Sequence, residues 1–477
     1  MTKTAVWSGG WVAEQLGVEL DTQSGIGGVV VEDLVGLALR INPRRAHLLV
    51  SRVLGKHVPA DPRLVHGAGR LLGALVADRL SGVDGGIADE GGKLLAAAVS
   101  GVDPLAPARL LALCDRHRVD LPAVDALVLG FAETATGLGH SVADGLFADY
   151  LHSTRRPVPA IAPVGAFEEA HSHATSHLLL PEDVQLLAGP RPLVLVDDEL
   201  STGATVMDTI RAVQAIAPRD RYLVAALVDL RSAGDRRLLD EFAARTGVRV
   251  DVVALATGRI RLPPDALDRG RGLVTQYGRP PISRAEARRA PSEASVAARW
   301  PGHVRDGARH GFTSADRPAF EDAVRECARG LMHAVPTEAG SRLLVLGTEE
   351  LMYLPTRVAA QLADLLEDRG VQVLFSSTTR SPVVPVDDPG YAIRTVVTFG
   401  SHDDPADGPG PRYVYNVASP ADGAPFDAVV LVIDDGSQSW PIDSAPLPDC
   451  LADVVAGPVH VLTVPSHHPL TATEAIR

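Results

Sequence analysis

The sequence has little cysteine, few aromatic residues and no long apolar run. Its three cysteines, Cys114, Cys327 and Cys450, are scattered and offer neither a disulfide framework nor the CxxC spacing of a metal site. We expect them to be small buried hydrophobic residues. No segment reaches the apolar length of a membrane span, and the first residues, MTKTAVWSGGW, contain no signal-peptide core. These absences favour a cytoplasmic protein without a membrane partner.

Positive charge is also scarce. The formal net charge is −14 and the isoelectric point is about 5.6, which argues against a nucleic-acid partner because such a partner needs a basic field. Nearly all basic residues are arginine, and the only lysines are Lys3, Lys56 and Lys93. High alanine, arginine, glycine and valine content suggests a GC-rich genome that replaces lysine by arginine. The lysine retained at position 56 is therefore a candidate functional residue.

The length of 477 residues allows two or three domains. Strand-like apolar runs alternate with helix-like segments in two stretches, which predicts an α/β fold of two domains, each a mostly parallel sheet with helices on both faces. We expect an irregular lead-in over 1–30, a first domain over 31–268, a linker over 269–299 rich in Arg, Ala, Pro and Ser, and a second domain over 300–477.

The run LVLVDDELSTGAT, residues 193–205, is the most informative motif. Its four leading apolar residues predict a buried parallel strand, so Asp197 and Asp198 emerge at the carboxyl end, where open α/β sheets bind ligands. Adjacent carboxylates can accept hydrogen bonds from the vicinal hydroxyls of a ribose. Residues 201–205 then lead into a helix whose free N–H groups and dipole favour a 5′-phosphate. The lysine and spacing of a P-loop are missing.

This run resembles the phosphoribosyl-diphosphate (PRPP) motif of type I phosphoribosyltransferases, such as the orotate enzymes, at all thirteen positions. The resemblance implies that Asp197 and Asp198 hold the ribose hydroxyls, directly or through water bound to Mg²⁺. It also implies a loop around the 5′-phosphate, made of Ser201, Thr202, Gly203, Ala204 and Thr205. The alternative is a solvated acidic turn after a strand.

A second turn, FAETATGLG over 131–139, leaves a predicted strand and enters a helix, so its amides can line an anion site. By position it matches the pyrophosphate loop of the same family, which implies contacts from Thr134, Thr136 and Gly137. Glu133 is unusual beside an anion and would act through Mg²⁺ or contact the acceptor. The alternative is an ordinary turn rich in glycine and threonine.

Arg155 and Arg156 lie where related enzymes place cations near a mobile loop that closes over pyrophosphate. Arginine forks suit diphosphate oxygens and stabilise the charge that grows as the C1′–O bond breaks. The lid would be FEEAHSHATSHLLL, residues 167–180, and three of its histidines could bind diphosphate or act as acid and base. They are His171, His173 and His177. The alternatives are a solvated arginine pair and ordinary loop histidines, with a metal site the least favoured.

Upstream, SRVLGKHVPADP places Arg52, Lys56 and His57 in one turn-rich segment after a strand. These groups could bring cations to PRPP or recognise an acidic acceptor, and the alternative is an exposed basic loop.

The second half repeats some patterns of the first but lacks a phosphate loop. Asp434 and Asp435 end a strand as Asp197 and Asp198 do, yet they lead into GSQSWP instead of small residues. The second domain is thus either Rossmann-like or a degenerate copy of the first.

The stretch TTRSPVVPVDDPGY, with LGTEELMYLP and YNVAS around it, resembles the TRSP domain that follows phosphoribosyltransferases in gene clusters linked to tellurite resistance and stress. The first half, with NPRRAHLLVSRVLGKHVPADP and GFAETATGLGHSVADGL, resembles the transferase partner. In the second domain we expect a separate acceptor or product pocket built from Glu349, Arg380 and Tyr391. The alternative for Arg380 and Tyr391 is a helix N-cap by Ser or Thr and a proline turn.

These features favour a Mg²⁺-dependent transferase that passes 5-phosphoribosyl from PRPP to an unidentified small-molecule acceptor and releases pyrophosphate. The resemblance implies biosynthesis of a ribosylated or nucleotide-like metabolite in a stress response. Two alternatives are a PRPP-sensing protein without turnover and the phosphorolysis or hydrolysis of a ribosyl 5-phosphate. A homodimer is one possible assembly.

Overall fold

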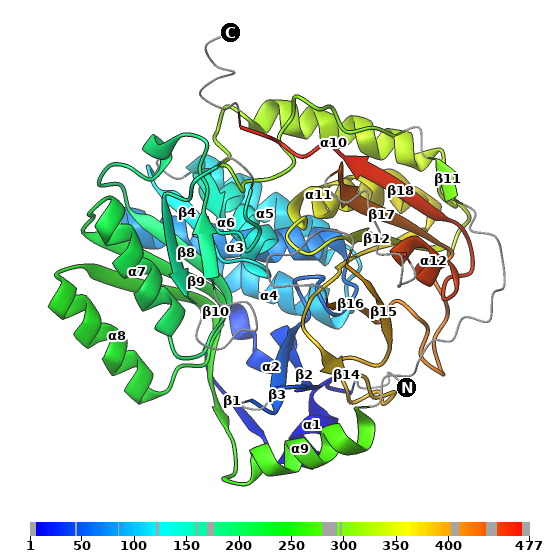
Figure 1. Ribbon diagram of the computed structural model, residues 1–477, viewed down its shortest axis with the longest axis horizontal. Helices are drawn as coiled ribbons and strands as arrows, with labels where there is room; N and C mark the ends of the chain where they lie inside the picture. The colour runs from blue at the N-terminus through cyan, green and yellow to red at the C-terminus, as the bar shows by residue number, and fades with distance from the viewer. Residues whose placement is uncertain are drawn as a thin grey trace.

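The computed structural model of the protein describes residues 6–42, 45–83, 85–120, 124–158, 161–168, 176–278, 293–295, 298–401, 410–435 and 446–469. We call the described chain up to residue 278 the first half and the described chain from residue 293 the second half. Each half contains one large sheet with helices against it, as Figure 1 shows. The predicted α/β class is confirmed.

The sheet of the first half has six strands, and all neighbours are parallel except β1, which runs antiparallel to β10 at one edge. In sheet order they are β1 (Glu19–Gly25), β10 (Arg249–Arg261), β9 (Arg221–Asp229), β8 (Leu193–Leu200), β4 (Leu127–Gly130) and β5 (Asp149–His152). The apolar starts of β4 and β8 are fully buried because helices cover both faces of the sheet.

The helices α3 to α6 gather on one side of this sheet, and α7 and α8 lie on the other (Figure 1). They are α3 (Pro62–Ser81), α4 (Ile87–Ser100), α5 (Ala106–Asp120), α6 (Ala135–Leu146), α7 (Ala204–Ile216) and α8 (Ala233–Thr246). A small hairpin of β6 (Gly165–Glu168) and β7 (Ser176–Leu179) stands apart from the sheet. None of the helices in the described ranges is both long and apolar enough to cross a membrane.

The sheet of the second half has five parallel strands. In sheet order they are β11 (Glu293–Ser295), β18 (Val459–Val464), β17 (Ala428–Asp434), β12 (Arg342–Gly347) and β13 (Gln372–Ser377). Alternate residues of β12 face opposite sides: Leu343 and Val345 join the main core, and Leu344 and Leu346 join a smaller one. The main core covers this sheet through α10 (Arg317–Met332) and α11 (Tyr353–Leu366). The smaller core contains α12 (Leu447–Ala452) and the hairpin of β15 (Val396–Gly400) and β16 (Pro411–Tyr415).

The two halves are interlocked. Strand β14 (Val383–Val384) of the second half pairs with β2 (Val35–Arg40), which pairs with β3 (His47–Ser51) of the first half. Two further backbone bridges join the halves, Ala60 with Phe375 and Tyr150 with Phe312. The main hydrophobic core draws buried residues from both halves without interruption. The halves therefore share one folded interior.

The predicted lead-in and linker are wrong over much of their length. Residues 6–30 contain α1 (Gly10–Leu16) and the edge strand β1, and the short helix α2 (Val31–Leu34) follows directly. Val12 and Leu16, one helical turn apart, are fully buried, and Gly17 ends α1 with φ +68. The predicted linker begins inside a helix, α9 (Ala266–Tyr277), and its residues 293–295 form β11. Residues 279–292 lie outside the described ranges.

Tertiary contacts explain why these segments are ordered. The indole of Trp11 on α1 makes edge contacts with Tyr277 of α9 and Tyr391 of the second half, at 5.5 and 5.3 Å between ring centroids. No local sequence pattern predicts either contact, because the three rings come from distant parts of the chain. Tertiary packing therefore overrides the weak local periodicity of these segments.

Candidate active site

The acidic motif lies where the winding of the first sheet reverses. From β4 the chain continues outward to β5, and from β8 it continues the other way to β9, so β4 and β8 are neighbours whose following helices diverge. Strand β4 pairs with β8 only as far as Gly130 opposite Val196, whereas β8 runs on along β9 to Leu200. The carboxyl ends of β4 and β8 therefore mark the switch point of this sheet, the place where doubly wound sheets bind ligands, and we call this place the crevice.

Asp197, Asp198 and Glu199 form the half-buried wall of this crevice. Burial, together with the neighbouring Glu199 carboxylate, raises the pKa of Asp198 to about 6, although Lys56 acts in the opposite direction. Arg45 partly compensates the cluster by an ion pair of 2.8 Å with Glu199. The wall is electrostatically suited to hydroxyl donors or a divalent cation.

The predicted phosphate loop has the expected local geometry. Gly203 precedes α7 with φ +82, a conformation that favours glycine, and α7 begins at Ala204. The Ala204 N–H donates to Thr202 Oγ1 at 3.3 Å. Ser201 and Thr205 are half-buried and Thr202 is exposed, so the loop is open to a ligand at the helix N-terminus.

The loop after β4 faces Lys56. Its Nζ lies 2.9 Å from Thr134 Oγ1 and 3.0 Å from Glu133 Oε1, and both charged side chains are buried. The peptide bond between Ala132 and Glu133 is cis, and the Ala132 N–H donates to Ser153 Oγ at 2.9 Å. Lys56 is therefore a cation held against this loop, and the exposed basic loop considered as an alternative is wrong.

Two predicted loop residues take other roles. Helix α6 begins at Ala135, so Thr136 and Gly137 lie in its first turn and not in an extended loop. Thr136 is buried and its hydroxyl donates to the Glu133 carbonyl at 3.1 Å. A Cβ on Gly137 would lie 3.0 Å from Met352 Cβ, so this glycine allows close contact with the second half. The contacts of Thr136 and Gly137 with pyrophosphate remain predictions.

Acids of the second half hold the predicted arginine pair. The Arg155 N–H donates to Glu350 Oε1 at 2.9 Å, and Arg156 Nη1 donates to Asp434 Oδ2 at 2.9 Å. Burial alone would raise the pKa of Glu350. The positive charges of Arg309 and Arg156 nevertheless lower this pKa to about 2. The interpretation of Arg155 and Arg156 as a solvated surface pair is therefore wrong.

Glu349 and Arg380 are close together as predicted, but they do not form a separate pocket. Glu349 is fully buried after β12, and its Oε2 lies 2.7 Å from both Nε and Nη2 of Arg380. Arg412 Nε donates to Glu349 Oε1 at 2.6 Å, and Arg156 Nη2 lies 3.6 Å from Glu349 Oε2. The group thus joins the arginine pair of the first half. Arg412 was missed, because no motif surrounds it.

Tyr391 is a packing residue. Its side chain is buried, its hydroxyl accepts from the Leu39 N–H at 2.7 Å and donates to the Val384 carbonyl at 2.5 Å. These bonds tie β2 to β14, so the prediction of Tyr391 as a ligand contact is wrong.

The remaining predicted cations lie away from the crevice or are neutral. Arg52 donates to the carbonyls of Asp33 and Val99, both at 3.2 Å. Burial, with Lys56 and Arg40 nearby, lowers the pKa of His57 to about 3, so this imidazole is neutral. Its ring lies 5.7 Å from that of Tyr415 in the second half. Neither side chain supplies positive charge for PRPP.

Only one of the three lid histidines is described, since His171 and His173 lie outside the described residues. His177 is buried on β7, its Nδ1 lies 2.9 Å from Ser153 Oγ, and its ring stacks on Phe167 at 4.7 Å. His177 therefore supports the hydroxyl that anchors the Ala132 amide.

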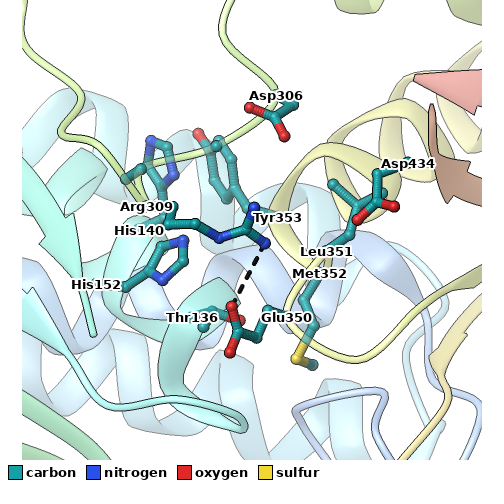
Figure 2. A pocket seen from close by; sticks show the side chains of 12 residues that line it. Thr136, His140, His152, Asp306, Arg309, Glu350, Leu351, Met352, Tyr353 and Asp434 are labelled. Atoms are coloured by element: carbon teal, nitrogen blue, oxygen red, sulfur yellow. Dashed lines mark hydrogen bonds and ion pairs between the residues drawn. The ribbon is translucent and has the colours of Figure 1, made fainter. Parts of the chain in front are cut away.

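A small cavity lies at the seam between the halves, shown in Figure 2. The first half contributes Thr136, His140 and His152, and the second contributes Arg309, which bonds to Glu350 at 3.4 Å, together with Tyr353 and Asp434. Its volume of about 20 Å³ is room for about one water molecule. We therefore assign it to the packed interface. No group of three or more His, Cys, Asp or Glu side chains in the described ranges is arranged to hold a metal on its own.

The fold is α/β, and the acidic motif with its glycine-containing loop lies where the winding of the first sheet reverses. A family model for phosphoribosyl transferases matches residues 34–259, and a model for the TRSP domain that lies carboxyl-terminal to it matches residues 306–444. The chain therefore contains a phosphoribosyl transferase domain followed by a TRSP domain, and both sequence resemblances are confirmed. No curated protein matches the sequence.

Several solved adenine phosphoribosyltransferases are similar to part of the chain. The enzyme from Trypanosoma brucei, in complex with AMP, pyrophosphate and ribose-5-phosphate, has 20% identity and a TM-score of 0.22, and the match covers 30% of this chain and 60% of that one. The enzyme from Giardia lamblia has 17% identity and a TM-score of 0.22, with 33% and 83% covered. The enzyme from Leishmania tarentolae has 17% identity and a TM-score of 0.24, with 36% and 78% covered.

Proposed function

We propose that the protein transfers the 5-phosphoribosyl group of PRPP to a small-molecule acceptor in a Mg²⁺-dependent reaction that releases pyrophosphate. The observation that carries the proposal is the crevice between β4 and β8. One wall has paired carboxylates followed by an open helix N-terminus, and the other has a loop held against Lys56. PRPP has two ends, a ribose 5-phosphate and a diphosphate. The first wall suits the ribose 5-phosphate, and the second suits the diphosphate.

Different residues bind the two ends of PRPP. Asp197 and Asp198 accept hydrogen bonds from the ribose hydroxyls, and the amides of residues 203–205 bind the 5′-phosphate. Lys56 and the loop after β4 take the diphosphate, with Arg156 nearby. As the C1′–O bond breaks, negative charge grows on the leaving diphosphate, and fixed cations there lower the barrier. The acceptor attacks C1′ from the opposite face and loses a proton as the new bond forms.

The crevice carboxylates fit Mg²⁺. Carboxylate oxygens are ligands that Mg²⁺ prefers, and this ion commonly uses one or two carboxylates together with phosphate oxygens of the substrate. Burial and the neighbouring Glu199 carboxylate raise the pKa of Asp198, and a divalent cation would favour its ionised form. Asp197 and Asp198 would hold the ion, directly or through water, with the substrate completing its ligands. When held there, Mg²⁺ would neutralise charge on the diphosphate and would make it a better leaving group.

The acceptor and the biological role are further parts of the proposal. We propose a small-molecule acceptor whose product is a ribosylated or nucleotide-like metabolite of a stress or tellurite-resistance response. The support is the pairing of a transferase domain with a TRSP domain in one chain.

Incubation of the full-length protein with PRPP, Mg²⁺ and a small-molecule extract tests the function. We expect PRPP-dependent release of pyrophosphate and a new product heavier than its acceptor by one phosphoribosyl group, detected by mass spectrometry. Binding of PRPP by calorimetry without any pyrophosphate release across extracts would instead support the sensing alternative. Release of pyrophosphate with ribose 5-phosphate as the sole product would indicate hydrolysis.

As a control, the same incubation uses Asp197→Asn with Asp198→Asn. If this variant turns over PRPP at the parent rate, the crevice is not the site of the reaction.

A further inference from the structure

The carboxyl ends of the strands in the two large sheets meet at the interface of the halves. In the TRSP domain Glu349 follows β12, Arg380 follows β13, and Asp434 ends β17. In the transferase domain, Glu133 follows β4 and Arg156 follows β5. The ion pairs of Arg156 with Asp434 and Glu349 connect these two edges directly. The TRSP domain thus presents its own functional edge to the crevice of the transferase.

Arg380 extends this connection to the loop after β4. Its Nε lies 3.9 Å from Glu133 Oε2, and Lys56 Nζ lies 3.0 Å from Glu133 Oε1. One carboxylate of this loop is therefore flanked by one cation from each domain. Because Glu133 and Thr134 are consecutive, the Arg380 guanidinium lies within a side-chain length of the position where the loop and Lys56 would bind a diphosphate.

We propose that the TRSP domain completes the phosphoribosyltransferase site, with Arg380 as a binding residue for the diphosphate of PRPP and for the pyrophosphate it becomes. This inference rests on the proposed function and deepens it, since it assigns the TRSP domain a role at the same site. A guanidinium fork matches diphosphate oxygens and can donate two hydrogen bonds at once.

Glu349 is the positioning residue for this arginine. It is fully buried, and one of its oxygens lies 2.7 Å from two nitrogens of Arg380. That contact uses Nε and Nη2 and therefore fixes the plane of the guanidinium. Rigid orientation lowers the entropy lost when a substrate group binds.

Several cationic side chains gather where the two strand edges meet. Arg156, Arg380 and Arg412 all approach the single carboxylate of Glu349. Lys56 lies against Glu133, and Arg156 also pairs with Asp434. Phosphate oxygens form charge-assisted hydrogen bonds with the same cations.

The test compares three ligands on the full chain by calorimetry with Mg²⁺: PRPP, inorganic pyrophosphate and ribose 5-phosphate. For Arg380→Ala we expect PRPP and pyrophosphate to bind about 10-fold or more weakly, because a charged hydrogen-bond pair is lost. Ribose 5-phosphate has no diphosphate and should bind as it does to the parent. Arg380→Lys keeps the charge without the fork and should fall between the two. Arg394→Ala is the matched control, since this arginine pairs with Asp387 and Asp422 at the surface of the same domain.

Parent-like affinity for pyrophosphate and PRPP in both Arg380 variants overturns the inference while leaving the proposed function standing. Equal weakening of all three ligands overturns it too, because it shows a purely structural role. If Arg380→Ala does not fold, the lysine variant decides between these outcomes. A parent protein that binds neither PRPP nor ribose 5-phosphate refutes the proposed function itself, and the inference with it.

Discussion

Each domain carries two consecutive aspartates at or near the carboxyl end of a central parallel strand, yet the two pairs have opposite surroundings. Asp197 and Asp198 lie half-buried beside the crevice, and burial raises the pKa of Asp198 to about 6. Asp434 is buried and its carboxylate is bound by Arg156 at 2.9 Å, while Asp435 accepts from the Ser466 N–H at 2.9 Å. The first pair is arranged for a ligand and the second for the other domain. Because both pairs are aspartates, the residues that follow them decide whether a pair faces a ligand site or the other domain.

The largest expected effect comes from separating the two domains. A fragment of residues 300–477 should not fold stably alone, because it loses the pairing of β14 with β2 and half of a continuous core. We expect a fragment without a cooperative thermal transition by calorimetry, with the full chain as control. A sharp transition in the fragment would show that the second domain folds without the first.

The next effect concerns the buried carboxylate at the seam. Glu349→Gln should lower the free energy of unfolding by about 3 kcal/mol or more, since removal of a buried charge leaves its partners uncompensated. The midpoint of urea unfolding measures this, and the exposed Glu326→Gln is the matched control. Equal midpoints for both variants would contradict the central role of Glu349.

The comparison between the acid pairs predicts a contrast in ligand binding. Asp197→Asn with Asp198→Asn should weaken ribose 5-phosphate by roughly 10-fold or more, because hydrogen bonds to charged groups contribute about 1.5–3 kcal/mol. Asp435→Asn should leave this affinity unchanged, because Asp435 caps a backbone amide. Calorimetry of both variants measures the contrast, and similar losses would mean that the two pairs do not differ in role.

The smallest expected effect is a pH dependence that belongs to Asp198. Its pKa of about 6 in the folded state lies above the value near 4 of an unfolded aspartate. The folded protein therefore holds the proton longer, and the contribution of this group to stability falls as the pH rises from about 4 to 6. Binding of Mg²⁺ with PRPP needs the ionised form, so affinity should rise about 10-fold from pH 5 to pH 7. In Asp198→Asn we expect that part of the rise to disappear; an unchanged pH profile would exclude Asp198 as its source.

The sequence predicts the crevice better than the seam, for a physical reason. The apolar start of β8, its acids and the glycine before α7 form one contiguous pattern, and each step follows from local chemistry. The scarcity of lysine drew attention to Lys56, which the structure places at the loop after β4. Local spacing is enough where the site is built from one strand and the turn after it.

The contacts between domains could not be predicted in the same way. Arg412 meets Glu349, and Arg156 meets Asp434, only because two sheets approach edge to edge. No spacing along the chain encodes that approach. Tyr391 shows the converse error, since a tyrosine beside a conspicuous motif turned out to fill the core between β2 and β14.

The pairing of β14 with β2 restricts insertions and deletions after Arg380 more strictly than it restricts substitutions. Val383 pairs with Arg40 and Val384 with Leu39, only three residues after Arg380. A single residue inserted between them would turn the two valines to the opposite faces of the strand or displace the guanidinium from Glu349. Substitutions within this stretch change one side chain at a time, whereas an insertion or deletion would alter the strand register and the arginine together. We therefore expect natural variants of this protein to keep the same number of residues between Arg380 and β14.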